Sequence, residues 1–337
     1  MRTDQDLQSS LEEEYYQIND DILQSFNKFR PPLNIYLFKE EVSRIMPFYR
    51  VGERLSKEQG ERLAELVKEG VIFVSRADHP VYVKHISYQL DLVLLDKHLK
   101  ETEIADIFKM ALTRRMAAFF DQPVKIVYDK VQEDVFTFTQ YLWQDLSRVK
   151  AMARRLHTEH SLANHSVNCG FLGLALFVAG LPPDYNADMK NRQTFDRTAL
   201  GFFLHDIGMS KVPPFIRDKN KPLTPEERQK IQTHTMSGYE MLARLDVKFP
   251  EVEQCLTQHH ERTDGTGYPQ RASGQSLTPL GQLCSVVDSF CAMIAKRPYA
   301  EPMELMAAAK RLCDDKRYPS ELTHRLLNFL VNEQGRS

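Results

Sequence analysis

Five histidines and two aspartates stand in short sequence contexts that suit metal binding. Imidazole nitrogens and carboxylate oxygens are ligands for first-row divalent ions such as iron, manganese, nickel and zinc. The sequence has no CxxC pair, which argues against a closed structural zinc site. The contexts make chemical sense only as a set: His165 in NHSVN, His205 and Asp206 in FLHDIG, His234 in QTHTMSG, His259 and His260 in QHHERTDGTGYP, and Asp288 in VVDSF.

Asp206 is the residue that could join two metal ions. It directly follows His205, and two adjacent residues cannot both point along one face of a helix. A carboxylate has two oxygens, however, and can bridge two ions while its neighbour binds one of them. Such a bridge holds two ions about 3.5–4 Å apart, close enough for a shared hydroxide to attack phosphorus. We therefore predict a dinuclear centre with Asp206 and His205 as catalytic residues.

The glycine-rich loop after His260 has residues that suit a tight turn beside this centre. Gly265 and Gly267 permit positive φ, and Pro269 stiffens the exit of the loop. The loop is therefore expected to present Tyr268 toward the metal pocket, as a contact for substrate or for the loop itself. A tyrosine that anchors the core is the alternative.

Taken in order, these motifs resemble the HD-GYP branch of the HD phosphohydrolase superfamily. The resemblance runs from about residue 156 to about residue 299 and includes the HD pair, HHE followed by DGTGYP, and VVDSFCAMIAKRPY. A lone HD dipeptide is a weak signal, whereas the ordered set is specific. The resemblance implies two ions, one bound by His165, His205, Asp206 and Asp288, and the other bound by Asp206, His234, His259 and His260.

The resemblance also implies a function, because members of this family hydrolyse cyclic di-GMP, and some act on related cyclic dinucleotides. The expected product is the linear dinucleotide, and whether the reaction continues to GMP is left open. The expected ions are iron first, with manganese, nickel or zinc as alternatives. A cyclic-dinucleotide receptor that has lost turnover and signals through its N-terminal domain remains an alternative. A different HD phosphohydrolase, acting on a nucleotide monophosphate or on (p)ppGpp, is disfavoured by the GYP loop.

The chain departs from the family pattern at two substrate contacts and at one metal-binding position. Arg297 matches a phosphate-binding arginine, but Met209 and Ala300 stand where active members carry basic residues. Lys211 could replace the missing lysine only if the helix breaks before Pro213, because two helical residues turn through about 200°. Ser161 stands where some members carry a third-metal glutamate, which favours two ions unless Glu159 or His160 reaches in.

Helical periodicity dominates the C-terminal half that must position these residues. Leu142, Leu146, Val149 and Leu156 recur on one helical face. They suit either packing on the domain's own core, which we favour, or a homodimer seam. We expect a C-terminal all-α domain of the HD type with a smaller N-terminal α/β domain, divided as a leading helix at 1–30, the α/β domain at 31–130, a linker helix at 131–160 and the HD-GYP domain at 161–337.

The N-terminal domain is predicted from its mixture of patterns. Short β-branched runs, VIFVSR from Val71 and VYVKHI from Val81, predict strands, and residues 56–69 predict a helix. No glycine-rich phosphate loop or dinucleotide fingerprint occurs there. A sensory or regulatory role, with signalling partner proteins, is the hypothesis for this domain.

Composition restricts the surroundings of the protein. The 337 residues suit two domains, and 44 basic against 46 acidic side chains give no broad basic field for duplex nucleic acid. No apolar run approaches the roughly 20 residues of a membrane span, and the N-terminus lacks the pattern of a signal peptide. We therefore expect a cytoplasmic protein without membrane attachment, whose five cysteines are buried reduced thiols.

Overall fold

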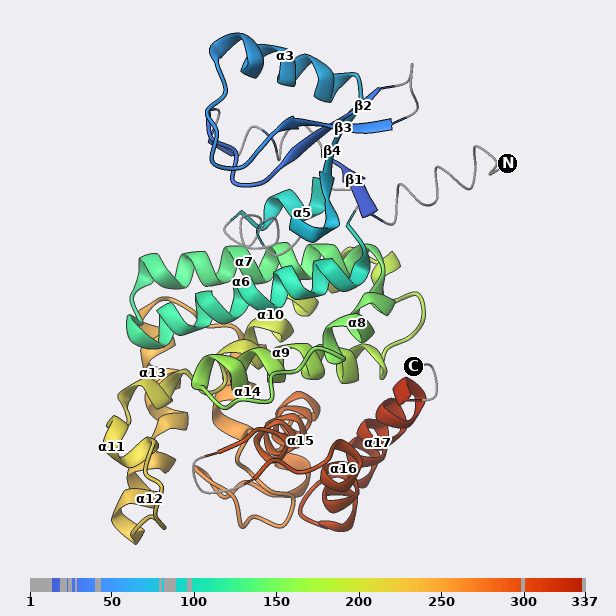
Figure 1. Ribbon diagram of the computed structural model, residues 1–337. Coiled ribbons are helices and arrows are strands. Elements are labelled where there is room, and N and C mark those ends of the chain that lie inside the picture. The colour runs from blue at the N-terminus through green and yellow to red at the C-terminus, as the bar shows by residue number, and fades with distance from the viewer. Residues whose placement is uncertain are drawn as a thin grey trace. The chain divides into compact units, whose positions relative to one another are not determined.

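A computed structural model describes residues 14–18, 23, 26–27, 29–39, 44–78, 81, 89–95, 99–297 and 301–334. Contacts divide the chain into two compact units, Met1–Ala111 and Leu112–Ser337. We call the first the sheet unit and the second the helical unit (Figure 1). The expectation of a mainly helical C-terminal region and a smaller N-terminal region that contains a sheet is confirmed.

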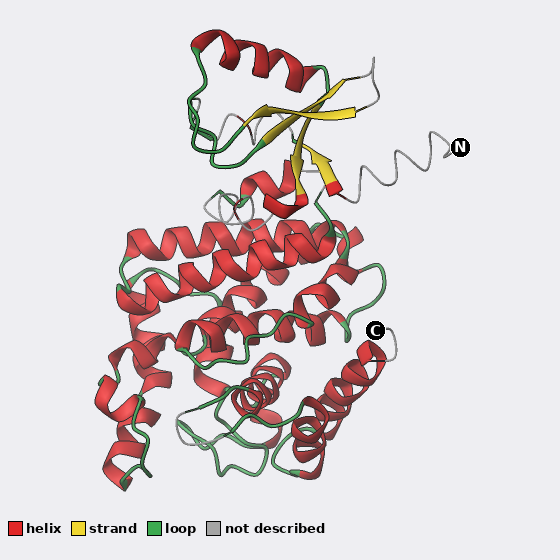
Figure 2. Cartoon of the chain, viewed as in Figure 1, coloured by secondary structure: helices red, strands yellow, loops and turns green. Residues whose placement is uncertain are grey.

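The described residues of the sheet unit form a four-stranded sheet of antiparallel pairs, whose strands are yellow in Figure 2 and follow the order β1-β4-β2-β3. Ile35, Ile72 and Val74 are fully buried and form its core with Leu63 and Leu66 of α3. The unit comprises β1 (Tyr15–Gln17), β2 (Ile35–Lys39), β3 (Arg44–Tyr49), α3 (Lys57–Lys68), β4 (Ile72–Ser75), η2 (Arg76–Asp78) and α5 (Asp91–Leu95), and α6 (Glu101–Asp121) continues into the helical unit.

A local signal explains where α3 begins. Ser56 begins α3 with a capping box, in which its hydroxyl accepts from the Gln59 N–H and the Gln59 side chain accepts from the Ser56 N–H. The helix predicted at 56–69 is confirmed as α3, and the strand predicted from Val71 is confirmed as β4. The strand predicted from Val81 lies outside the described residues except for Val81 itself, which is helical.

The predicted leading helix at 1–30 is wrong at residues 15–17, which form β1. Tyr16 is buried between two less buried neighbours, and the strand pairs with β4 from Tyr15↔Ser75 to Gln17↔Phe73. Pairing with a distant strand therefore overrides the helical preference of a charged segment. Most of the other residues of that segment lie outside the described part.

The helical unit is built around four central helices that pack on one another, namely α9 (Leu162–Val178), α10 (Lys190–Leu204), α14 (Pro250–Gln258) and α15 (Pro279–Ile294). Helix α9 is buried on almost all sides from Ala163 to Leu176. Around the central four lie the other elements: α7 (Lys125–Gln144), η3 (Leu146–Arg148), α8 (Val149–Ala153), η4 (Tyr185–Ala187), η5 (Ile207–Lys211), α11 (Pro214–Arg217), α12 (Pro225–Gln232), α13 (His234–Arg244), η6 (Gly274–Ser276), α16 (Leu305–Asp314) and α17 (Ser320–Gln334).

Aromatic rings fix how closely the central helices approach. The ring of Phe203 in α10 lies 6.0 Å from that of Phe138 in α7 and 6.3 Å from that of Phe171 in α9. A Cβ atom on Gly170 would lie 2.4 Å from the Phe203 ring, and one on Gly173 would lie 2.6 Å from the Phe202 ring. The two glycines therefore allow α9 and α10 to pack against each other over these rings.

The predicted single linker helix at 131–160 is wrong, because α7 ends at Gln144 and two short helices follow. Asp145 stops the helix in an extended conformation, and its carboxylate accepts from the Ser147 N–H to begin η3. Leu142 and Val149 are buried. Because α7 packs on α10 and α8 packs on α9, the stripe packs on the core of its own unit, the arrangement favoured over a dimer seam.

The structure also bears on the expected surroundings. Among the described residues, no helix is long and apolar enough to span a bilayer. All five cysteines are free, and four of them, Cys169, Cys255, Cys284 and Cys291, are buried. The prediction of buried reduced thiols is therefore confirmed for these four.

Replacing Phe203 with alanine should lower the free energy of unfolding of the helical unit by about 3–5 kcal/mol, because it empties a fully buried ring site. The single tryptophan, Trp143, lies in this unit, so its fluorescence in a urea titration measures the change. The control is Phe215→Ala, since that ring is 75% exposed. Equal losses in the two variants would contradict this account of the core.

Candidate metal centre

The histidines and aspartates predicted to bind metal lie mostly at the ends of helices. His205 caps the C-terminus of α10, and Asp206 begins the next element, η5. His259 likewise caps α14, and His260 follows it outside the helix. Because the backbone leaves the helix between or after these neighbours, adjacent side chains can enter one pocket. His234 is the first residue of α13, while His165 and Asp288 project from α9 and α15.

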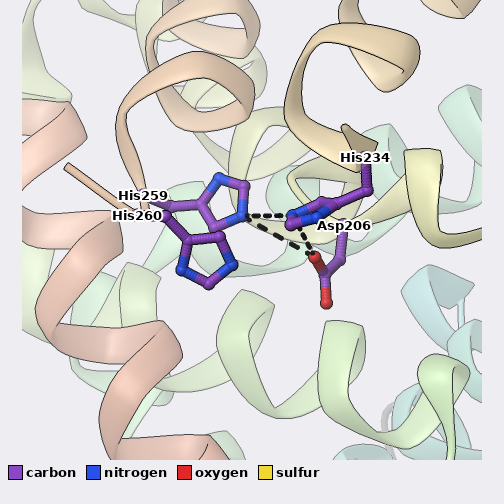
Figure 3. Close-up of side chains that lie close together, drawn as sticks. All are labelled: Asp206, His234, His259 and His260. Atoms are coloured by element: carbon purple, nitrogen blue, oxygen red, sulfur yellow. Dashed lines mark hydrogen bonds and ion pairs between the residues drawn. The ribbon is translucent and has the colours of Figure 1, made fainter. Parts of the chain in front are cut away.

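The two oxygens of Asp206 face two different groups of histidines. Oδ1 lies 3.1 Å from His234 Nε2 and 3.6 Å from His259 Nε2. Figure 3 shows these two rings converging on that oxygen, with His260 beside them. Oδ2 lies 3.7 Å from His165 Nε2 and 4.0 Å from His205 Nε2. This is the arrangement that a bridging carboxylate needs.

Asp288 also lies close to both groups of histidines. Its Oδ1 lies 3.0 Å from His165 Nε2 and 3.9 Å from His205 Nε2, while Oδ2 lies 3.5 Å from His260 Nδ1. The structure thus brings together all seven residues that the sequence suggested as metal ligands. These residues come from distant parts of the sequence, since His165 and Asp288 are separated by 123 positions.

Backbone carbonyls orient three of the imidazole rings. The Nδ1 atoms of His205, His234 and His259 lie 2.7–2.8 Å from the carbonyl oxygens of Phe202, Ile231 and Cys255. A carbonyl oxygen can only accept, so Nδ1 carries the hydrogen in each ring and a neutral ring offers the Nε2 lone pair to the pocket. In the described part of the chain, the buried His205 Nε2 has no hydrogen-bond partner. The donor set therefore fits divalent cations.

The charges of the pocket also favour cations. Burial opposes ionisation of Asp206, but hydrogen bonds with His234 and His259 outweigh it and hold its pKa well below the usual range. Burial likewise opposes ionisation of Asp288, whose pKa is nevertheless held well below the usual range by the neighbouring histidines. Burial and the adjacent His259 hold the pKa of His260 well below its usual value. Ionised carboxylates and a neutral imidazole are the forms that bind metal.

Among the residues that the structure describes, candidate ligand atoms group into two clusters. Atoms of Asp206, His234, His259 and His260 lie within 4.8 Å of one another, and so do atoms of His165, His205 and Cys169. Cys169 was interpreted from sequence only as a buried thiol, yet its Sγ lies 3.6 Å from His165 Nε2. The spacing of four residues in a helix was the available signal, since residues i and i+4 are neighbours.

Close backbone approaches hold the clusters together. A Cβ atom on Gly208 would lie 1.9 Å from the His234 carbonyl oxygen, so only glycine lets η5 bring Asp206 against the start of α13. Gly265 has φ of +78°, as predicted. Gly267 also permits positive φ, but it is not among the described residues that adopt it. Gly267 is required by packing instead, since its Cβ would lie 2.4 Å from Glu261 Cα.

A cavity of about 710 Å³ opens beside the metal cluster. Tyr268 lines it, with its ring 4.7 Å from that of His260, and Arg297 and Met209 line it as well. Lys211 is exposed and is not among the lining residues, although it belongs to η5, so the lysine offered as a substitute is not brought into the cavity. Ala300, the other departure, lies outside the described residues.

The cavity has basic residues that the sequence reasoning missed. Arg217, Lys219, Lys221 and Arg228 line it from the segment around α11 and α12. Lys219 pairs with Glu227 at 2.7 Å and Arg217 pairs with Asp218 at 2.8 Å. The dense charge of RDKNK from Arg217 was a signal for this, but only the fold places the segment beside the cluster.

Ser161 has a structural role that explains its place in the sequence. Its hydroxyl accepts from the Asn164 N–H and begins α9 one turn before His165. His160 lines the cavity, with its ring 6.5 Å from that of His165, and burial together with Arg297 lowers its pKa to about 4. Glu159 is not among the lining residues, and its backbone forms an isolated parallel β-bridge with that of Lys296.

Comparison with known proteins gives consistent matches in this region. Residues 185–319 match the family described as HD domain. The chain is 37% identical over 130 residues to a cyclic di-GMP phosphodiesterase of Thermotoga maritima, which covers 37% of this chain and 35% of the relative. It is 33% identical over 129 residues to a 3'3'-cGAMP-specific phosphodiesterase of Vibrio cholerae, covering 36% and 25%. The chain thus spans about a third or less of the length of these curated relatives.

A solved structure resembles the chain over almost its whole length. It is an HDG"Y"P protein from Bdellovibrio bacteriovorus, with a TM-score of 0.58 and 18% sequence identity. The similarity covers 94% of this chain and 99% of that one. At this identity the likeness supports the fold.

Gly208→Ala should lower the free energy of unfolding of the helical unit by about 1–3 kcal/mol, because its methyl group would push η5 away from the backbone of His234. Trp143 fluorescence during urea unfolding provides the measurement. Lys211→Ala in the same short helix is the control, and it should change stability by less than about 0.5 kcal/mol because the side chain is exposed. A Gly208→Ala variant as stable as this control would refute the packing argument.

Proposed function

We propose that the helical C-terminal part of this chain belongs to the HD-GYP family and that the protein is a metal-dependent phosphodiesterase of cyclic di-GMP or a related cyclic dinucleotide. The observation that carries the proposal is the position of Asp206, with one carboxylate oxygen toward each histidine cluster. Two divalent ions, with iron first and manganese, nickel or zinc as alternatives, would supply an activated hydroxide and charge neutralisation there.

The protein's own residues have distinct tasks in this proposal. His165 and His205 would hold one ion with Asp206 and Asp288, and His234, His259 and His260 would hold the other with Asp206. The carbonyl contacts to Nδ1 keep three rings in the orientation that directs Nε2 into the pocket. Arg297 grips a phosphate through paired N–H groups, and Tyr268 contacts the substrate from its place against His260.

The cavity suits an anion of this size. Its volume of about 710 Å³ lies within the range of small-molecule sites, about 300–1,000 Å³. Lys221 and Arg228 line it, and among the described residues neither forms an ion pair. These two side chains are therefore available to substrate phosphates and partly replace the charge that Met209 does not provide. Signalling through the sheet unit and dimerisation remain predictions.

The direct test is hydrolysis of cyclic di-GMP and of 3'3'-cGAMP by protein purified without oxygen and loaded with each candidate metal. Chromatography of the products should reveal the linear dinucleotide and GMP, and Asp206→Asn should yield neither. Tight nucleotide binding without product would select the receptor alternative instead. Neither binding nor product with any metal would refute the proposal.

Metal content should identify Asp206 as the bridge. Elemental analysis of wild-type protein should find about two transition-metal ions per chain, because the seven side chains fill two sites with one shared carboxylate. Asp206→Ala should remove both ions, whereas His165→Ala should remove chiefly one, since His165 faces a single cluster. Equal metal loss from the two variants would contradict the assignment.

Substrate charge recognition should depend on position 209 and not on Lys211. Met209→Lys should raise kcat/KM for cyclic di-GMP by about tenfold or more, because a charged hydrogen bond contributes roughly 1.5–3 kcal/mol. Lys221→Ala should lower it, and Lys211→Ala should leave it unchanged because that residue does not line the cavity. The comparison is made at equal metal content. Loss of activity in Lys211→Ala, or no response to Met209→Lys, would overturn this view of the pocket.

A further inference from the structure

The helical unit has a second cavity, of about 550 Å³, that no part of the proposed reaction uses. Its lining comes from the end of α9 and from α10, α14, α15 and α17. Apolar side chains, among them Phe177, Leu181 and Leu283, form part of its wall. Thr198 and Glu251 contribute polar groups to the same wall. The cavity therefore has both an apolar surface and hydrogen-bonding groups.

Two buried oxygen atoms in this wall have no hydrogen-bond partner within the described part of the chain. They are Thr198 Oγ1 and Glu251 Oε2, and the whole residue Thr198 is only 1% exposed. Thr198 thus lacks even the bond to the preceding turn that helical threonines commonly form. Gly201, one turn later, brings α10 close to this place, because its Cβ would lie 2.9 Å from the Glu251 carbonyl oxygen. Unpaired buried oxygens cost free energy, and a bound donor would recover it.

Charge determines which donor fits. Arg325 lines the cavity, but its Nη2 atom lies 2.7 Å from Glu321 Oε1, so these two charges offset each other. Glu251 forms no ion pair among the residues that the structure describes, and it leaves the cavity with excess negative charge. A carboxylate in the first turn of α14 also stabilises the helix dipole, but that effect does not require a cavity or a buried threonine.

We propose that this cavity binds a small primary amine with an apolar body. The ammonium group donates hydrogen bonds to the Glu251 carboxylate and to the Thr198 hydroxyl. The hydrocarbon part packs on Phe177 and Leu283. The cavity is large enough for a ligand of this class.

The site is linked through helices to the candidate metal ligands. Thr198 lies in α10, about 10 Å along the helix axis from its C-cap His205 at 1.5 Å per residue. Glu251 lies in α14, about 12 Å along the axis from its C-cap His259. Helix α15 carries both Leu283 and Asp288. An occupant would therefore touch three of the helices whose other turns carry the metal cluster, at a place separate from the substrate cavity.

Isothermal titration of the purified full chain with cyclohexylammonium and with butylammonium tests the proposal, and cyclohexanol serves as the uncharged probe. At least one amine should bind, and cyclohexanol should bind at least about tenfold more weakly, because it cannot form the charged hydrogen bond. The measurement is of binding and not of hydrolysis, so its outcome is independent of the proposed phosphodiesterase activity.

Matched variants assign the binding to this cavity. Glu251→Gln should weaken amine binding by at least about tenfold. Glu253→Gln should leave it unchanged, since Glu253 also lies in the first turn of α14 but is exposed and outside the cavity. Thr198→Val keeps the shape of the side chain and should weaken binding severalfold. Trp143 fluorescence verifies folding of each variant. Absence of binding by both amines, or equal affinity of wild type and Glu251→Gln, would overturn the proposal.

Discussion

One carboxylate, only 13% exposed and with both oxygens engaged, constrains the architecture of the helical unit. Asp206 can remain ionised at this depth only because imidazole rings approach both oxygens, and those rings come from α9, α10, α13 and α14. Each helix must therefore begin, end or pass at one defined place. The capping Ser161 before His165 and the end of α10 at His205 meet this requirement through local backbone geometry.

Small residues make the required approach possible, and aromatic residues fix its distance. Gly208 allows η5 to touch the backbone of α13, while Gly170 and Gly173 let α9 lie against the phenylalanines of α10. These contacts are distant from one another in sequence, yet they act on the same pair of clusters. The geometry of the site thus depends on how closely the core elements pack.

The sequence could predict the cluster of histidines and aspartates because its residues occur in short motifs with ligand chemistry, and the helical class because apolar periodicity is long and regular. It could not predict β1, since that strand depends on pairing with β4 across the chain. The division after Gln144 depended on a single Asp145 cap. Cys169 and the basic residues at 217–228 gained meaning only from their neighbours in space, which spacing along the chain does not reveal.

The separation of His165 and Asp288 by 123 positions gives the cluster a mechanical meaning. Ions shared between such distant residues would act as a removable cross-link that closes a long loop of chain. Closing a loop of this length in an unfolded chain carries a large entropy cost, which grows only slowly with further length. Insertions in the surface turns between the central helices would therefore be tolerated, whereas removing any one of these helices would break the cross-link.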